Sequence, residues 1–208
     1  KELGIKMSVH VDDPLIAVSK EHPDYPANGE RFFKELNERF MTKAKTKLTT
    51  ENSIDYLSMR IKALADGRVT LDNDVAVANM IKGWGLEGCN TTKRPLSKDT
   101  LALMAQEKDA GRMLTGEDIK MYQKGIGELN WLVQTTHPDL TPAVSILGSY
   151  SCNPPESGLK AIKQAMRYCA GTIGRVLTPT DLTTAPVFSS DSDWAGLHGV
   201  TGETRSRG

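Results

Sequence analysis

The pattern of apolar and polar positions predicts strands near the start of the chain and mostly helices after them. Apolar runs at residues 5–11 and 15–19, rich in β-branched side chains, flank an acidic pair. They predict a β-hairpin with Asp12 and Asp13 at its tip. Aromatic and leucine side chains then recur at helical spacing, which predicts a helix over about 29–41 packed on a sheet through Phe32, Phe33, Leu36 and Phe40.

A second pair of strands is expected over residues 54–64 and 68–72. The dipeptide Asp66-Gly67 between them suits the positive φ of a tight hairpin turn. Short helices are expected at 73–83 and 98–108, within a region that glycine and proline otherwise interrupt.

The strongest helical signal in the chain starts at Thr115, where Thr115-x-x-Asp118 approximates a capping box. Apolar residues follow at spacings of three and four and predict a core stripe of Ile119, Tyr122, Ile126, Leu129 and Val133. With about 100° of rotation per residue, a separate face carries Gln123, Gly127 and Trp131. The indole therefore needs a partner other than this core, and both the next helix and nucleic acid are candidates.

Two further helices are expected at 138–152 and 156–170. The first has its apolar positions at Leu140, Val144 and Leu147, and the second at Leu159, Ile162, Met166 and Cys169. Gly171 is expected to end the second helix. Strands are expected at 175–178 and 187–190.

Charge and cysteine content limit the classes of function. The 208 residues include 26 Lys and Arg and 26 Asp and Glu, so the formal net charge is zero and any nucleic-acid surface must come from local placement of charge. Three cysteines without C-x-x-C spacing argue against a disulfide framework or a zinc site. Neither a membrane-length apolar run nor a signal peptide is recognised, so we expect an intracellular protein, cytoplasmic or nuclear, without membrane contact. The sequence does not indicate an oligomeric state.

The acidic pair at the hairpin tip is the first candidate for chemistry. Two carboxylates on a rigid turn can hold Mg²⁺, a hard cation that takes oxygen ligands and keeps waters and phosphates in its other positions. The other interpretation is that Asp12 and Asp13 simply form a turn, because aspartate is common in turns.

Five segments in a fixed order carry a resemblance to a known family. His10-Val11-Asp12-Asp13 resembles the YVDD box of reverse transcriptases, with His10 in place of tyrosine. The other four segments are DYLSMRI at 55–61, GELNWL with TTHPD at 127–139, RYCAGT at 167–172 and SDSDWAG at 190–196. Together they resemble the polyprotein of copia-type LTR retrotransposons along nearly the whole chain.

The resemblance implies an α+β fold. Residues 1–92 correspond to the C-terminal half of a reverse-transcriptase palm, with antiparallel hairpins and a helix. Residues 93–180 correspond to helices of the thumb and connection, and residues 186–208 to the start of an RNase H-like domain with its first strand.

It also implies metal and nucleic-acid sites. Asp12 and Asp13 correspond to catalytic ligands of Mg²⁺ (or Mn²⁺), and Asp191 to the first of four metal ligands of RNase H. Leu57-Ser58-Met59 corresponds to the primer-grip segment that passes near the primer end, with Ser58 in place of the usual glycine.

A second resemblance is to the first thumb helix of retroviral reverse transcriptases. It implies that Gln123, Gly127 and Trp131 lie along the minor groove of a primer–template duplex, either RNA/DNA or DNA/DNA. Lys120 and Lys124 lie beside this face and could meet phosphates. A structural tryptophan at a helix–helix seam is the competing interpretation.

The full enzyme of this family synthesises DNA from dNTPs on an RNA or DNA template through two-Mg²⁺ nucleotidyl transfer. In the family, one catalytic aspartate lies upstream of Lys1 and the other RNase H acids lie beyond Gly208, so this chain is expected to be inactive on its own. The alternatives are a non-catalytic remnant that acts as a nucleic-acid-binding or scaffolding module, and an unrelated α+β protein.

Overall fold

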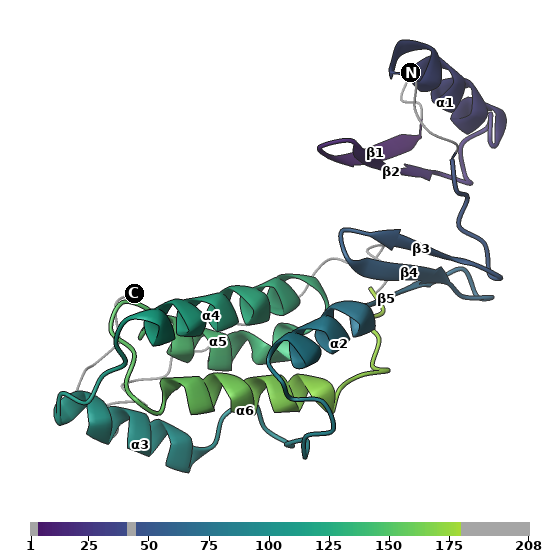
Figure 1. Ribbon diagram of the computed structural model, residues 1–208. Coiled ribbons are helices and arrows are strands. Elements are labelled where there is room, and N and C mark those ends of the chain that lie inside the picture. The colour runs from purple at the N-terminus through teal and green to yellow at the C-terminus, as the bar shows by residue number, and fades with distance from the viewer. Residues whose placement is uncertain (1–3, 41–44, 180–208) are drawn as a thin grey trace, which may run out of the picture.

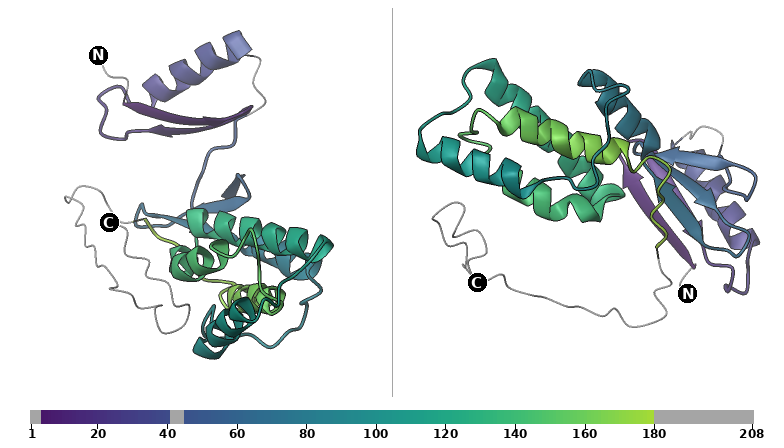
Figure 2. Two further views of the ribbon diagram at one scale, coloured as in Figure 1. Left: turned by 90° about the vertical axis from the view of Figure 1, so that its left-hand side faces the viewer. Right: turned by 90° about the horizontal axis from the view of Figure 1, so that it is seen from below.

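The computed structural model describes residues 4–40 and 45–179 (Figure 1). The described chain forms two small antiparallel sheets and a group of helices. The three-stranded sheet lies between the N-terminal hairpin with its helix and the helical part, as Figures 1 and 2 show. Strand 187–190 and Asp191 lie outside the described residues.

The N-terminal unit contains the expected hairpin. Strands β1 (Ile5–His10) and β2 (Asp13–Val18) pair so that His10 lies opposite Asp13, which leaves Val11 and Asp12 as a two-residue turn. Helix α1 (Ala27–Phe40) packs closely on β2, since a Cβ at Gly29 would lie 3.0 Å from Val18 Cγ2.

One core prediction for α1 is wrong. Phe32, Phe33 and Leu36 are half-buried, but Phe40 is 70% exposed. A two-stranded hairpin is too narrow to cover the last turn of this helix.

The second sheet differs from the predicted strand pair. Residues 54–64 do not form one strand, because the two-residue turn Leu57-Ser58 divides them into β3 (Ser53–Tyr56) and β4 (Met59–Ala63), with Tyr56 opposite Met59. Strand β5 (Val69–Asp72) pairs with β4 after the expected turn at Asp66-Gly67. Both turn residues have positive φ, 50° at Leu57 and 62° at Ser58, a conformation that the sequence does not signal without glycine or asparagine.

The helical part is built around one core. Its helices are α2 (Asp74–Gly83), α3 (Lys98–Asp109), α4 (Glu117–Thr135), the 3₁₀ turn η1 (Pro138–Leu140), α5 (Thr141–Gly148) and α6 (Gly158–Ala170). The expected helix 138–152 is therefore shorter and starts with a 3₁₀ turn, but its three apolar positions are buried as predicted. Helix α2 contributes Val77, Met80 and Ile81 to the same core.

Helix α4 runs through this core. Tyr122 and Leu129 of the predicted stripe are fully buried, and Ile119, Ile126 and Val133 are half-buried. Gly125 and Leu132 are buried as well. A Cβ at Gly125 would lie only 2.5 Å from Ile162 Cγ2, so the glycine allows α4 and α6 to approach closely.

The start of α4 is not the predicted capping box. Gly116, with φ of 57°, is the N-cap residue and has no side-chain cap, while the backbone N–H of Asp118 donates to the carbonyl oxygen of Thr115. Thr115 therefore lies one residue too early to cap the helix with its hydroxyl.

After α6, residues 175–178 do not form the expected strand. They make an isolated bridge to β5, in which the backbones of Leu71 and Leu177 exchange hydrogen bonds of 2.8 and 2.9 Å. Gly171 is the C-cap of α6, as predicted. The three cysteines form no disulfide. In the described ranges no helix has the length and apolar character needed to cross a membrane.

Candidate nucleic-acid interface

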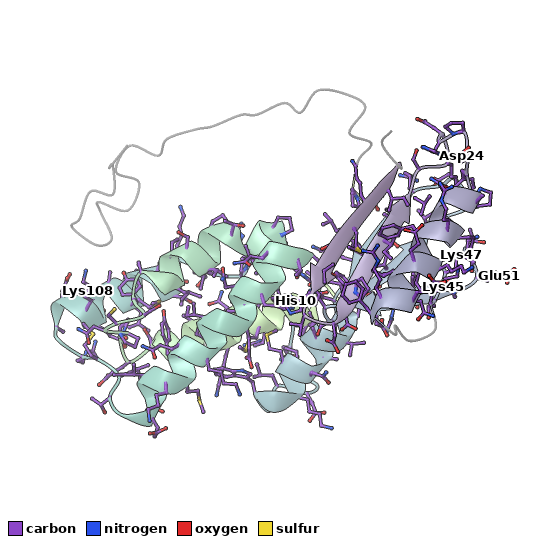
Figure 3. The ribbon with its side chains drawn as sticks, turned by 90° about the horizontal axis from the view of Figure 1, so that it is seen from above. His10, Asp24, Lys45, Lys47, Glu51 and Lys108 are labelled. Carbon is purple, nitrogen blue, oxygen red and sulfur yellow. The ribbon has the colours of Figure 1, made fainter. Side chains whose placement is uncertain are left out.

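The tip of the β1–β2 hairpin presents its two acids to solvent. Asp12 lies in the turn, and Asp13 is the first residue of β2, opposite His10, which Figure 3 labels. Val11 has a φ of 54°, which is unusual for a β-branched residue. Backbone strain of this kind is often found at functional turns, where it fixes the direction of neighbouring side chains.

The hairpin provides two of the ligands that a divalent cation needs. Mg²⁺ in proteins is commonly held by one or two carboxylates together with waters and phosphate oxygens, so the donor set of Asp12 and Asp13 fits such an ion. Within residues 4–40 and 45–179, no three His, Cys, Asp or Glu side chains form a group that could hold a metal. The metal ligand Asp191 expected from the resemblance lies outside this part of the chain.

The turn between β3 and β4 presents backbone as well as side chains. Ser58 is exposed, whereas Leu57 and Met59 on either side of it are half-buried. The hydroxyl groups of Ser8 in β1 and Tyr56 in β3 are 3.4 Å apart, which places β1 of the acidic hairpin beside this turn. In Figure 1 both turns project in the same direction.

Asn73 connects this turn to the C-terminal end of α4. The residue is only 2% exposed, and its amide nitrogen lies 3.2 Å from the carbonyl oxygen of Ser58 and 3.1 Å from that of Asp72. The amide nitrogen donates to both carbonyl oxygens, and the amide oxygen accepts from Thr135 Oγ1 at 2.5 Å. Because Thr135 is the last residue of α4, these bonds join the turn to the C-terminal end of that helix.

The predicted second face of α4 is exposed. Gln123 and Gly127 face solvent, and a Cβ at Gly127 would meet nothing within 4 Å. Trp131 is 41% exposed and belongs neither to the core cluster nor to the half-buried side chains packed against it. This exposure argues against a tryptophan buried in a helix–helix seam. The amide of Gln123 does have a partner, because its Nε2 donates to the carbonyl oxygen of Ser151 at 2.9 Å.

The two lysines beside this face are paired with acids of the same helix. Lys120 Nζ lies 2.7 Å from Glu117 Oε1, and Lys124 Nζ lies 3.7 Å from Glu128 Oε1. Exposed ion pairs of this kind contribute about 0–1 kcal/mol, so a phosphate group can displace the carboxylate at little cost. Glu128 is held in place from the other side, since Trp84 Nε1 donates to its Oε2 at 2.6 Å.

Sequence reasoning missed three residues of this region. Asn130 and Gln134 are exposed and lie seven residues after Gln123 and Gly127, so helical spacing could have placed them on the same face. Asn73 carried no comparable signal, because its partners are separated from it by 15 and 62 residues along the chain.

The segment around His137 has a structural role. His137 is buried, with Nδ1 2.9 Å from Thr136 Oγ1 and Nε2 3.0 Å from Thr172 Oγ1. Burial lowers the pKa of this imidazole, and the carboxylates of Asp139 and Asp74 oppose the shift. Tyr168 of α6 donates its hydroxyl proton to Asp139, which holds the same segment from the other side.

Comparison with known proteins finds partial similarities, among them the following two. The chain is 34% identical over 76 residues to "Secreted RxLR effector protein 161" of Plasmopara viticola, which covers 36% of this chain and 54% of that protein. It is 35% identical over 88 residues to the "Retrovirus-related Pol polyprotein from transposon RE1" of Arabidopsis thaliana, which covers 42% of this chain and 6% of that polyprotein.

The Pol polyprotein match supports a retroelement-related origin. The two alignments cover about half of the effector and a small part of the polyprotein, respectively. No protein-family model and no solved structure matches the sequence.

Proposed function

We propose that this chain is the C-terminal part of a copia-type RNA-directed DNA polymerase and that it holds a primer–template duplex against α4 and the β3–β4 turn. The observation that carries the proposal is the Asn73 junction. The sequence suggests two separate nucleic-acid segments, at residues 57–59 and 120–131, and Asn73 bonds to Ser58 of the first and to Thr135 at the end of the helix that carries the second.

The chemistry of the α4 face suits the minor groove of a duplex containing RNA. Gly127 leaves room for a sugar–phosphate strand to approach the helix backbone. The exposed ring of Trp131 can pack on sugars, and amide side chains at 123, 130 and 134 can hydrogen-bond to 2′-hydroxyls and base edges. Lys120 and Lys124 can contact phosphates after exchanging their carboxylate partners.

In this proposal the hairpin contributes to polymerisation when the rest of the palm is present. Asp12 and Asp13 would hold Mg²⁺ or Mn²⁺, which supplies charge stabilisation for the phosphates of the incoming dNTP. Asp12 and Asp13 are exposed at the tip of this hairpin, and its strand β1 lies beside the β3–β4 turn, which corresponds to the primer-grip segment in the proposal.

The remaining parts of the proposal follow the same resemblance. Residues 1–92 form the palm part, residues 93–180 the thumb and connection, and residues 186–208 begin an RNase H domain in which Asp191 is a metal ligand. We propose an intracellular location, where the nucleic-acid substrates are found.

Duplex binding tests the α4 face. We expect Trp131→Ala to weaken binding of a labelled RNA/DNA hybrid about tenfold, because an aromatic contact with a nucleotide contributes about 1–3 kcal/mol. Met121→Ala is the matched control, since Met121 is a 48% exposed apolar residue on the same helix, well away from Gln123 and Gly127. Equal affinities of the two variants in fluorescence anisotropy would contradict the proposal. Loss of helicity in Trp131→Ala would instead assign the indole to the core.

Primer extension tests the acidic hairpin. In a chain extended upstream through the preceding palm strand, we expect Asp12→Asn to abolish Mg²⁺- or Mn²⁺-dependent incorporation, because the change removes a carboxylate ligand without changing size. Asp109→Asn, at the exposed end of α3, should incorporate nucleotides as the unmodified chain does. Unchanged incorporation in Asp12→Asn would show that the metal assignment is wrong.

A non-catalytic nucleic-acid-binding or scaffolding remnant is the second candidate. Its support is the similarity to a protein described as a secreted effector, together with a hairpin that supplies two carboxylates where no third ligand lies nearby in the described chain. Duplex binding without any incorporation by the extended chain would favour this candidate.

A further inference from the structure

Helix α6 carries an unusual concentration of positive charge for a chain with no net charge. Residues 158–170 contain three cations, Lys160, Lys163 and Arg167, and no carboxylate. The spacings of three and four place them on one face of the helix, opposite the buried face that contains Ile162 and Met166.

A loop of the same charge lies against this face. Residues 88–98 contain Lys93, Arg94 and Lys98 and no carboxylate. Side-chain hydrogen bonds hold this loop and the first turn of α3 on α6. Arg167 Nε donates to the carbonyl oxygen of Asn90 at 2.5 Å, Thr92 Oγ1 donates to the carbonyl oxygen of Gln164 at 3.3 Å, and Thr100 Oγ1 donates to Gln164 Oε1 at 2.6 Å.

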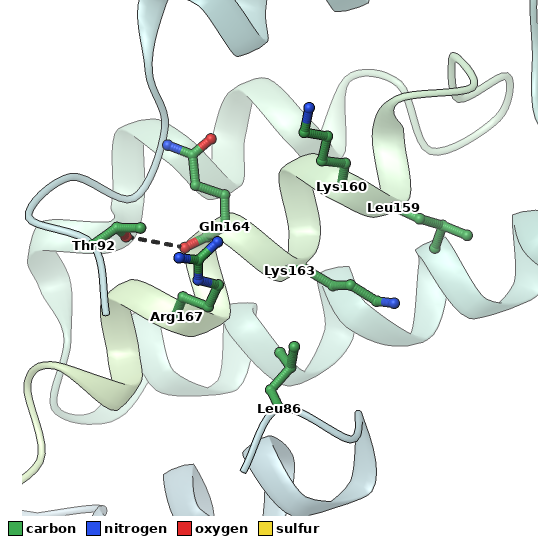
Figure 4. Close-up of a pocket in the computed structure, with 7 residues that line it drawn as sticks. All are labelled: Leu86, Thr92, Leu159, Lys160, Lys163, Gln164 and Arg167. Atoms are coloured by element: carbon green, nitrogen blue, oxygen red, sulfur yellow. Dashed lines mark hydrogen bonds between the residues drawn. The ribbon is translucent and has the colours of Figure 1, made fainter. Parts of the chain in front are cut away.

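Between loop and helix lies an open hollow of about 400 Å³ (Figure 4). Leu86 and Leu159 give it an apolar part, and the three cations of α6 with Gln164 give it a polar part. The nearest acids in sequence, Glu87, Asp99 and Glu156, do not line it. Among the described residues, no ion pair involves Lys160 or Lys163, in contrast to Lys120 and Lys124 of α4.

Arg167 and Gln164 have N–H groups in this hollow that can donate to an anion. Arg167 uses Nε for Asn90, and a guanidinium has four further N–H groups in a fixed geometry that matches phosphate. The bond from Thr100 fixes the oxygen of the Gln164 amide, so its NH₂ group is directed elsewhere.

We propose that the α6 basic surface, which we define as Lys160, Lys163 and Arg167, binds the phosphodiester backbone of a polynucleotide. Figure 4 shows the lysines and Arg167 extending in different directions around the hollow. The rise of about 1.5 Å per residue places Arg167 about 10 Å from Lys160 along the helix axis. A line of cations of this length suits a repeating polyanion better than a single phosphate group.

This surface is separate from the α4 face. The two helices meet where Gly125 approaches Ile162, and the exposed faces of both helices point away from that contact. The inference rests on the proposed function for its class of ligand, but it shares no residue with the duplex site.

The salt dependence of binding tests the proposal. The double variant Lys160→Gln, Lys163→Gln is compared with Lys20→Gln, Lys34→Gln, which removes the same charge from exposed positions of the N-terminal unit. Affinities of the full chain are measured by fluorescence anisotropy between 50 and 200 mM salt for a labelled oligo(dT), an RNA/DNA hybrid and poly-glutamate. Circular dichroism checks that both double variants fold.

Each lost phosphate contact reduces the steepness of log K against log salt by about 0.7 for a single strand and about 0.9 for a duplex. Because the α6 variant removes two lysines, we expect a reduction of about 1.4 for a single strand or about 1.8 for a duplex. The polynucleotide that shows the loss identifies whether the surface binds a single strand or a duplex. Slopes equal to those of the control variant for both polynucleotides would overturn the inference. Loss of binding to poly-glutamate alone would overturn it as well, because it would indicate an acidic protein partner.

The same assay separates this inference from the proposed function. If Trp131→Ala loses duplex affinity and the α6 variant loses none for either polynucleotide, the inference falls and the duplex site stands. If only the α6 variant loses affinity, the inference is supported and the α4 face is overturned.

Discussion

Two glycines in α4, only two residues apart, have opposite surroundings. Gly125 is buried where α4 meets α6, and a Cβ there would lie 2.5 Å from Ile162 Cγ2 and 3.1 Å from the ring of Trp84. Gly127 is exposed and has open space around its missing side chain. The first glycine therefore serves packing of the helices, and the second leaves room for a ligand in the proposed duplex site.

Alanine at these two positions should change stability in opposite directions. We expect Gly125→Ala to lower the free energy of unfolding by about 1–3 kcal/mol through overpacking. Gly127→Ala should raise it by up to about 1 kcal/mol, because alanine is the better helix former. Urea unfolding followed by circular dichroism measures both. A stabilised Gly125→Ala would show that α6 can move aside.

The Gly127 variant also tests function. If a duplex lies against α4, the added methyl group should weaken binding although it stabilises the helix. Opposite changes in stability and affinity cannot come from unfolding. Unchanged affinity would show that nothing approaches the helix closely at this position.

The sequence predicted the existence and approximate bounds of helices α4 and α6, because helical spacing depends on local residues. The buried positions Tyr122, Leu129 and Ile162 follow directly from that spacing. The division of residues 54–64 could not be predicted, because Leu57 and Ser58 are ordinary residues with positive φ. Asn73, the N-cap residue of α2, bonds to the carbonyl oxygen of Ser58 in this turn, and that contact joins residues 15 apart along the chain.

Removal of the Asn73 side chain should loosen this turn from α4. We expect Asn73→Ala to lower the free energy of unfolding by about 1–3 kcal/mol, because the carbonyl oxygens of Ser58 and of the buried Asp72 lose their donor. The duplex affinity should fall as well, since the two parts of the proposed site are no longer held together.

Asn79→Ala is the control for this prediction. Asn79 is exposed on α2, so removal of its side chain should change the free energy of unfolding by no more than about 0.5 kcal/mol. Equal losses of stability in the two asparagine variants, measured by denaturant unfolding, would contradict the junction.

Three of the five segments that carry the family resemblance, at 55–61, 127–139 and 167–172, meet at junctions within the described chain. The segment 55–61 reaches α4 through Asn73, and the segment ending at Asp139 contacts the segment 167–172 through Tyr168 and Thr172. These contacts were not visible in the sequence, because each joins residues far apart along the chain. The resemblance therefore marks the junctions of the fold as well as its candidate sites.

The buried His137 should make the stability of this assembly depend on pH. Its pKa is lowered from 6.5 by burial, so below about that pH the unfolded chain binds a proton that the folded chain rejects. The contribution of the neutral imidazole to the free energy of unfolding is present in full above the pKa of the unfolded chain. It is lost as the pH falls below that value towards the lower pKa of the folded chain. We expect the free energy of unfolding to decrease between pH 7.5 and 5.

Replacing the imidazole identifies this contribution. His137→Gln should flatten that part of the pH profile, whereas His10→Gln, at the exposed hairpin, should keep the profile of the unmodified chain. Thermal unfolding at a series of pH values measures the difference. Identical profiles for His137→Gln and the unmodified chain would show that other groups cause the loss.

The Asn73 junction has one more consequence if the proposed function holds. A rotation of α4 relative to the three-stranded sheet has to break the hydrogen bond between the Asn73 amide oxygen and Thr135 Oγ1, because the other two bonds of this amide, to the carbonyl oxygens of Ser58 and Asp72, stay on the sheet side. The corner between the Ser58 turn and Trp131 is then fixed before a ligand arrives. Because A-form and B-form helices differ in the width and depth of the minor groove, such a corner selects nucleic acids by their helical geometry, independently of base sequence.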